Sequence, residues 1–167
     1  TGCNVVARKG SARQKVVVCA HIDSKAGTPG ALDNAAGIVT LLLLAELLES
    51  YKGRLGVEVV AFNGEDYYAS PGEILYLESN RNTLNEIALA INMDGLGYRG
   101  NKVAFSLYDC PDTIASAIRA VFAGYEHLVQ GEQWPQGDHM IFVMNQRPAL
   151  ALTSDQFAEI WNSIAHT

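Results

Sequence analysis

Polar side chains that could bind a metal ion or transfer a proton follow the ends of three apolar stretches of the sequence. They are His21 and Asp23, Glu65 and Asp66, and Asp94. Taken singly, each is compatible with ordinary turn chemistry, because loops after strands are polar and Asp is a common turn former. Imidazole and carboxylate donors without thiolate suit Zn²⁺, with Mn²⁺ or Co²⁺ as alternatives. The joint pattern predicts a metal site.

The loop over residues 21–37 adds one more carboxylate at its far end. Asp33 follows a stretch punctuated by Gly and Pro and stands at the start of an apolar helical segment. Two ions about 3.5 to 4 Å apart need a bridging carboxylate, and we expect Asp33 in that position. His21 and Asp23 are two residues apart in extended chain, so their side chains share one face. We expect Asp23 to accept the second imidazole N–H and orient the ring, a simple turn acid being the alternative.

Two adjacent acids follow Gly64 at the end of the second apolar stretch. Carboxylates side by side are costly unless cations neutralise them. The side chains of consecutive residues point in different directions, so one can bind metal while the other faces a water molecule. Positions 65 and 66 are therefore predicted to supply one ligand and one general base.

The apolar pattern predicts the elements that position these groups. Strands are expected at 16–20, 57–62, 87–93, 103–107 and 148–153, and helices at 34–51, 70–78, 111–122 and 157–165. Strands that alternate with helices predict a three-layer α/β domain with a mostly parallel mixed sheet. Ligands bind beyond the carboxyl ends of the strands in such sheets, so the polar groups should converge.

Composition argues against several classes of partner. The 167 residues include 12 Lys and Arg against 18 Asp and Glu, and no basic cluster occurs, which argues against nucleic acid. The most apolar segment, 35–48, is shorter than the roughly 20 residues of a membrane span and is predicted to be a buried helix. Three widely spaced Cys are typical of reduced thiols, which favours the cytoplasm without fixing the compartment. No linker separates a second domain, so one domain is expected over residues 1–167, and the lack of an initiating Met is consistent with trimming at both ends.

Six short motifs occur in one order from near the first residue to the last. They are H-x-D at 21–23, A-L-D-N-A-A-G at 31–37, F-N-G-E-D at 62–66, N-M-D-G at 92–95, G-D-H-M-I-F at 137–142 and H-T at 166–167. In these motifs the chain resembles the M28 family of zinc aminopeptidases over nearly its whole length. The resemblance implies a single catalytic domain with the phosphorylase/hydrolase-like zinc exopeptidase fold.

Carried over position by position, the resemblance implies two Zn²⁺ sites that share one carboxylate. It implies that one zinc is held by His21, Asp33 and Asp94. The other is held by Asp33, Asp66 and His166. Asp66 is one methylene shorter than the Glu most common in the family, so its zinc must lie closer to the backbone or bind less tightly. His166 is the penultimate residue, where chain ends fray.

The resemblance also assigns residues that do not bind metal. It makes Glu65 the general base and implies a cis peptide between Asp33 and Asn34. Asp138 and His139 match an Asp–His pair of the family near the substrate pocket. A helix-capping Asp beside a packing His is the alternative for that pair.

The activity implied by the resemblance is metal-dependent hydrolysis of N-terminal peptide bonds, with a peptide that has a free N-terminus as substrate. A glutaminyl-peptide cyclase with one zinc and a non-catalytic binding module are the alternatives. Retention of both His21 and His166 around Asp33 favours two metals, and a binding module should have lost ligands. The family is usually larger, so an edge strand or a pocket wall is expected to be missing, and the sequence does not indicate the oligomeric state.

Overall fold

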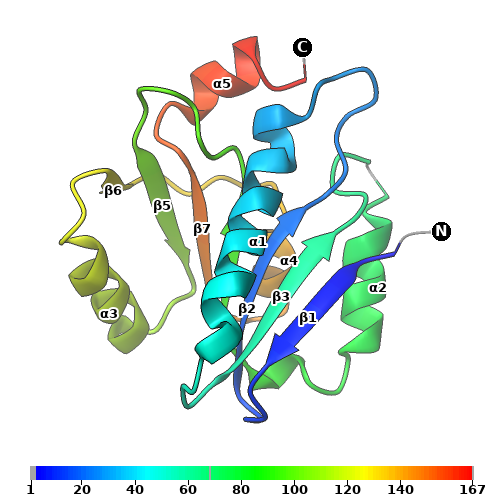
Figure 1. Cartoon of the computed structure of the whole chain (residues 1–167), viewed down its shortest axis with the longest axis vertical. Helices are drawn as coiled ribbons and strands as arrows, with labels where there is room; N and C mark the ends of the chain where they lie inside the picture. Colours follow the sequence, from blue (N-terminus) through cyan, green and yellow to red (C-terminus); the bar gives the residue numbers. More distant parts are fainter. Residues whose placement is uncertain (1–2, 68, 167) are drawn as a thin grey trace.

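The fold is built on one mixed sheet, seen in a computed structural model that describes residues 3–67 and 69–166. Its strands are β1 (Val5–Lys9), β2 (Lys15–His21), β3 (Gly56–Phe62), β4 (Ile87–Met93), β5 (Val103–Tyr108), β6 (Leu128–Gln130) and β7 (Ala149–Ser154). They lie in the order β1-β3-β2-β4-β7-β5-β6 (Figure 1). The central strands β3, β2, β4 and β7 are parallel, whereas β1 and β5 run antiparallel to their neighbours β3 and β7.

Helices cover both faces of this sheet. They are α1 (Ala36–Leu47), α2 (Pro71–Ser79), α3 (Asp112–Phe122), α4 (His139–Met144) and α5 (Phe157–Ser163). Alternate residues of a strand point to opposite faces. Val18 of β2 accordingly packs with Leu41 of α1, whereas Val17 packs with Tyr76 of α2 and Phe142 of α4. The predicted three-layer α/β fold with a mostly parallel mixed sheet is confirmed.

The apolar segment after the opening loop differs from its prediction as a buried helix. Leu41 is 3% exposed, but Val39, Leu42 and Leu47 on the outer side of α1 are 55%, 65% and 77% exposed. The sheet covers only one side of the helix, which explains the difference. By length and composition alone, residues 31–50 could cross a membrane. Leu41 of this segment packs with Val18 of the sheet, and Ile38 and Leu44 lie against the same cluster.

Candidate metal centre

The five predicted metal ligands meet beyond the carboxyl ends of β2, β3 and β4. His21 Nε2 lies 3.0 Å from Asp33 Oδ1 and 3.6 Å from Asp94 Oδ1. His166 Nε2 lies 2.9 Å from Asp33 Oδ2 and 3.0 Å from Asp66 Oδ1. Asp33 therefore presents one carboxylate oxygen to each imidazole. This is the arrangement that a bridging carboxylate between two ions requires.

The donor atoms have the spacing and the environment of a metal site. Tetrahedral Zn²⁺ with bonds of about 2.0–2.2 Å holds its donors about 3.3–3.6 Å apart, close to the separations of 2.9–3.6 Å found here. Nine buried side-chain atoms within residues 3–67 and 69–166 lack a hydrogen bond of acceptable geometry, and three of them belong to this cluster: His21 Nε2, Asp33 Oδ2 and Asp66 Oδ2. Such atoms need a partner, and these residues form a group that could hold a cation. The chain's donors fit the implied metal.

The electrostatics of the cluster show what a cation would supply. Burial alone would lower the pKa of His21, but hydrogen bonding to Asp33 and Asp94 raises it to about 12. Burial also raises the pKa of Asp66, and the nearby Asp33 carboxylate adds to the effect. The pKa of Asp33 is lowered, because contacts with His21 and His166 outweigh burial. Positive charge placed among these carboxylates therefore stabilises the group.

The position of Asp33 is held by the hydrogen bonds of the next residue, Asn34. The peptide bond between Asp33 and Asn34 is cis, as the resemblance implies. The Asn34 side chain is buried, donates Nδ2 to the carbonyl of Met93 at 2.8 Å and accepts the Gly37 N–H at 3.0 Å. Met93 ends β4 and Gly37 lies in the first turn of α1. Asn34 thus ties the start of α1 to the strand that precedes Asp94.

The Asp23 carboxylate was predicted to accept an N–H of the His21 ring, but in the structure it accepts backbone N–H groups of another loop. His21 Nδ1 lies 3.0 Å from the backbone carbonyl of Asp23 but 3.9 Å from its carboxylate. The carboxylate accepts the backbone N–H groups of Gly64, Glu65 and Asp66 at 2.6, 3.2 and 3.1 Å. These three contacts turn the carboxylate away from the ring. The carbonyl of Asp23 faces the second ring nitrogen, and the carboxylate positions the loop that carries the proposed base.

Glu65 is partly buried beside the cluster. Burial, together with the charges of Asp94 and Asp66, raises its pKa to about 8, although His21 opposes the shift. Acids with strongly shifted pKa values often mark sites of proton transfer. Metal ions at the cluster would favour the ionised form of Glu65, which is the form that a general base needs.

Asp138 and His139 lie at the start of α4 and are 1% and 0% exposed. His139 Nε2 lies 3.2 Å from the Trp134 carbonyl, and its ring contacts Tyr108 and Trp134. Asp138 makes no capping hydrogen bond at the N-cap position, so the structure does not support the capping alternative. Both residues lie outside the five-residue cluster, and a role toward substrate remains a prediction for them.

An aromatic stack near the C-terminus packs against His166 and was missed by sequence reasoning. The Trp161 and His166 ring centroids are 4.6 Å apart. Trp161 in turn contacts Phe157, which stacks on Trp134. Phe157 and Trp161 are four residues apart and so share one side of a helix. That spacing could have indicated that α5 packs its aromatic side chains together.

The sequence and the fold of the chain are both similar to those of known proteins. The model of peptidase family M28 matches residues 4–167. The "Alkaline phosphatase isozyme conversion protein" of Escherichia coli is 31% identical over 121 residues, which cover 64% of this chain and 35% of that protein. The fold is similar to that of a zinc aminopeptidase from Bacillus subtilis, with a TM-score of 0.79 and 22% identity over 98% of this chain and 43% of that one.

A solved structure of a second kind of enzyme shares the fold. The glutaminyl cyclase of Macrostomum lignano matches with a TM-score of 0.77 and 22% identity, covering 98% of this chain and 64% of that one. This chain therefore spans between about a third and two-thirds of the length of the proteins it matches. Because the family model matches nearly the whole sequence, the chain belongs to peptidase family M28.

Proposed function

We propose that the chain is the catalytic domain of a metal-dependent aminopeptidase that holds two zinc ions. The observation that carries the proposal is the position of Asp33, whose two oxygens face His21 and His166 separately. One ion would be held by His21, Asp33 and Asp94, and the other by Asp33, Asp66 and His166. Mn²⁺ or Co²⁺ could occupy the same donors.

Zinc bound at these donors supplies a water of lowered pKa and a Lewis acid for the scissile carbonyl. Glu65 takes the proton of the attacking water and gives it to the departing amine. The carboxylate of Asp23 keeps Glu65 in place by holding the backbone N–H of residues 64–66. Burial of the donors, which are between 1% and 21% exposed, keeps bulk water from screening the site.

A glutaminyl-peptide cyclase reaction is the second candidate, because glutaminyl cyclases are among the similar structures. Two complete donor sets joined by Asp33 favour the aminopeptidase. A non-catalytic binding module is disfavoured because each ligand position holds a residue able to bind metal. The substrate we propose is a peptide with a free N-terminus.

The test pairs metal analysis with hydrolysis of amino-acid anilides by the zinc-loaded chain and by Glu65→Gln. We expect the variant to keep its metal and to lose turnover about 100-fold or more, as is usual for loss of a general base. Glu126→Gln is the matched control, because the Glu126 side chain is 87% exposed and remote from the cluster, and it should leave turnover unchanged.

Three outcomes would contradict this function. Unchanged turnover in Glu65→Gln would remove the residue from its role. Release of ammonia from peptides with N-terminal glutamine, without hydrolysis of any anilide, would assign the cyclase reaction instead. Metal retention by a parent chain that catalyses neither reaction would favour the binding module.

A further inference from the structure

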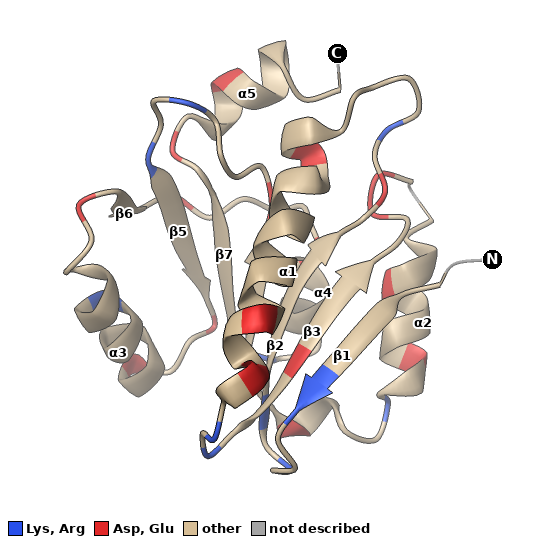
Figure 2. Cartoon of the chain, in the orientation of Figure 1, with Lys and Arg blue, Asp and Glu red and all other residues tan. Residues whose placement is uncertain are grey.

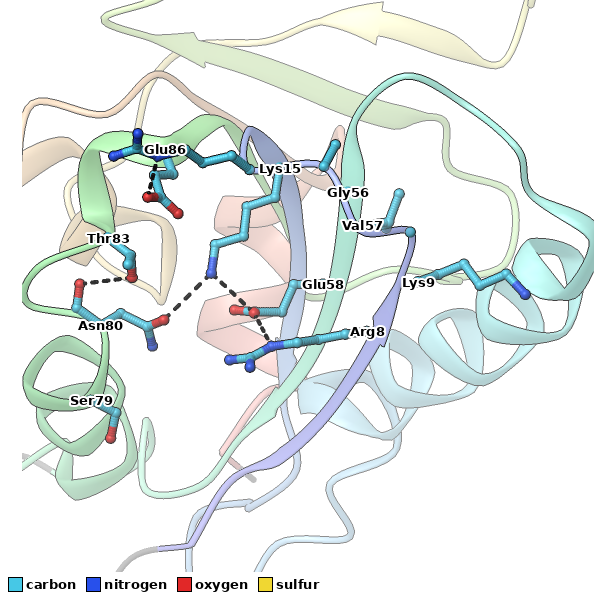
Figure 3. Close-up of a pocket in the computed structure, with 13 residues that line it drawn as sticks. Arg8, Lys9, Lys15, Gly56, Val57, Glu58, Ser79, Asn80, Thr83 and Glu86 are labelled. Carbon is cyan, nitrogen blue, oxygen red and sulfur yellow. Dashed lines mark hydrogen bonds and ion pairs between the residues drawn. The ribbon is translucent and has the colours of Figure 1, made fainter.

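A separate cavity lies at the end of the sheet opposite the candidate metal centre. It has a volume of about 380 Å³ and lies where β1 ends and β2 and β3 begin (Figure 3). Small-molecule sites commonly measure about 300–1,000 Å³. The strand β2 reaches both places, because Lys15 at its start lines the cavity and His21 at its end belongs to the cluster.

The cavity is basic, although the chain carries a net charge of −6. Its charged lining consists of Arg8, Lys9, Arg13 and Lys15 against Glu58 and Glu86. The Lys9 amine donates to the carbonyl of Glu49 and points away from the cavity (Figure 3). Three cations and two carboxylates therefore remain, an excess of one positive charge. Figure 2 shows the basic residues of β1 and of the neighbouring loops at this end of the sheet.

Lys15 forms the inner wall of the cavity. Its side chain is 14% exposed, and Nζ lies 3.0 Å from Glu58 Oε2 and 3.4 Å from Asn80 Oδ1. An ammonium group has three N–H donors, so a third remains for a ligand. Glu58 Oε2 also accepts Arg8 Nε at 2.6 Å, and Oε1 accepts the Tyr76 hydroxyl at 2.6 Å. One buried carboxylate thus balances two cations.

Two guanidinium groups stand at the mouth of the cavity. The side chains of Arg8 and Arg13 are 66% and 80% exposed, and each contacts a carboxylate through Nε. A guanidinium group has five N–H donors in a planar fork, which suits it to two-point contact with oxyanions. Both groups are accessible to a ligand from solvent. Thr83 and Ser79 add hydroxyl groups to the same lining.

We propose that this cavity binds a small multivalent oxyanion of the phosphate class. Lys15 contacts the anion from the inner wall, and Arg8 and Arg13 contact it at the mouth. A multivalent anion is favoured over a single carboxylate because three cations line the cavity and two of them reach solvent. This site is independent of the proposed hydrolytic activity.

The test is calorimetric titration of the zinc-loaded chain with pyrophosphate at constant ionic strength. We expect one saturable site in the parent chain. Lys15→Gln should weaken binding about tenfold or more, since it removes a charged donor from a mostly buried position. Arg13→Gln should weaken binding about threefold, because its charge is exposed and screened. Arg99→Gln, an exposed basic residue outside the cavity, should bind like the parent.

The two cavity variants differ in how much they are expected to destabilise the fold. Lys15→Gln leaves Glu58 with fewer partners, so its melting temperature is measured alongside. Arg13 is largely exposed, and its variant is expected to fold like the parent. Absence of saturable binding, equal weakening in Arg99→Gln, or binding that neither cavity variant changes would overturn the proposal. The last of these results would place the anion at the metal centre.

Discussion

At the scale of single residues, the chemistry of the candidate metal centre depends on which atom of each side chain faces which partner. The types and positions of the cluster residues could be predicted, because the motifs name them and the ends of parallel strands bring them together. The contact between the Asp23 carbonyl and His21 Nδ1 could not be predicted, because every residue has a backbone carbonyl and the sequence does not show which one faces the ring. The packing of Trp161 on His166 likewise depends on a fold that local patterns do not specify.

The Asp23 carboxylate is expected to position the backbone segment that carries Glu65. Asp23→Ala should leave the N–H groups of residues 64–66 without their acceptor, at a cost of about 1–3 kcal/mol for each group that stays buried. Because Glu65 lies in that segment, we expect turnover to fall while zinc content is retained. Asp23→Asn keeps one acceptor oxygen and should give an intermediate rate. Equal turnover in Asp23→Ala and in the parent would rule out the positioning role.

The environment of Glu58 leads to a prediction for how the free energy of unfolding changes at acid pH. Burial would raise its pKa, but bonds from Tyr76, Lys15 and Arg8 outweigh burial and hold it below the usual value of 4.5. A carboxyl with a depressed folded-state pKa stabilises the protein above its unfolded-state pKa, and this contribution is lost as the pH falls through the folded-state value. We expect Glu58→Gln to lower the free energy of unfolding at pH 7 by about 2 kcal/mol.

The same variant should flatten the loss of stability below pH 4.5, as measured by urea denaturation across that range. Glu126→Gln, at an exposed position, serves as the control and should follow the parent curve. A Glu58→Gln curve parallel to that of the parent below pH 4.5 would show that this carboxyl does not govern the acid response.

At the scale of elements, the helices and strands with a strong hydrophobic pattern were predicted well, whereas the shortest elements were not predicted. The strand β4 has the predicted bounds, α2 is shifted by one residue at each end, and α3 begins one residue later than predicted. Both α4, with six residues, and β6, with three, are too short for periodicity to be detected. The edge strand β1 reads VVARK, has mostly exposed residues and exists by pairing with β3. Long-range pairing of this kind has no local signal.

The helix α1 allows a matched comparison on one element. Leu41 is 3% exposed and packs on the sheet, so Leu41→Ala should lower the free energy of unfolding by about 2–5 kcal/mol. Leu47 is 77% exposed, so Leu47→Ala should change it by about 0.5 kcal/mol or less. Denaturant unfolding of both variants measures the difference. Similar losses at the two positions would mean that the outer side of α1 is covered in solution.

At the scale of the whole molecule, the sheet separates two sites of opposite charge. Carboxylates gather beyond the ends of β2, β3 and β4, where a cation is needed, and basic residues gather where β2 and β3 begin. Each end therefore favours a ligand of the other sign. The sequence predicted the acidic end because motifs mark it. The basic cavity at the start of β2 and β3 was not predicted, because its residues are brought together only by the turns between strands.

The most direct measurement of the central claim is anomalous X-ray diffraction at the zinc edge from crystals of the zinc-loaded chain. We expect two anomalous peaks about 3.5–4 Å apart, one on either side of the Asp33 carboxylate. His21 and Asp94 should contact one peak, and His166 and Asp66 the other. A single peak, or two peaks that do not share Asp33, would contradict this claim.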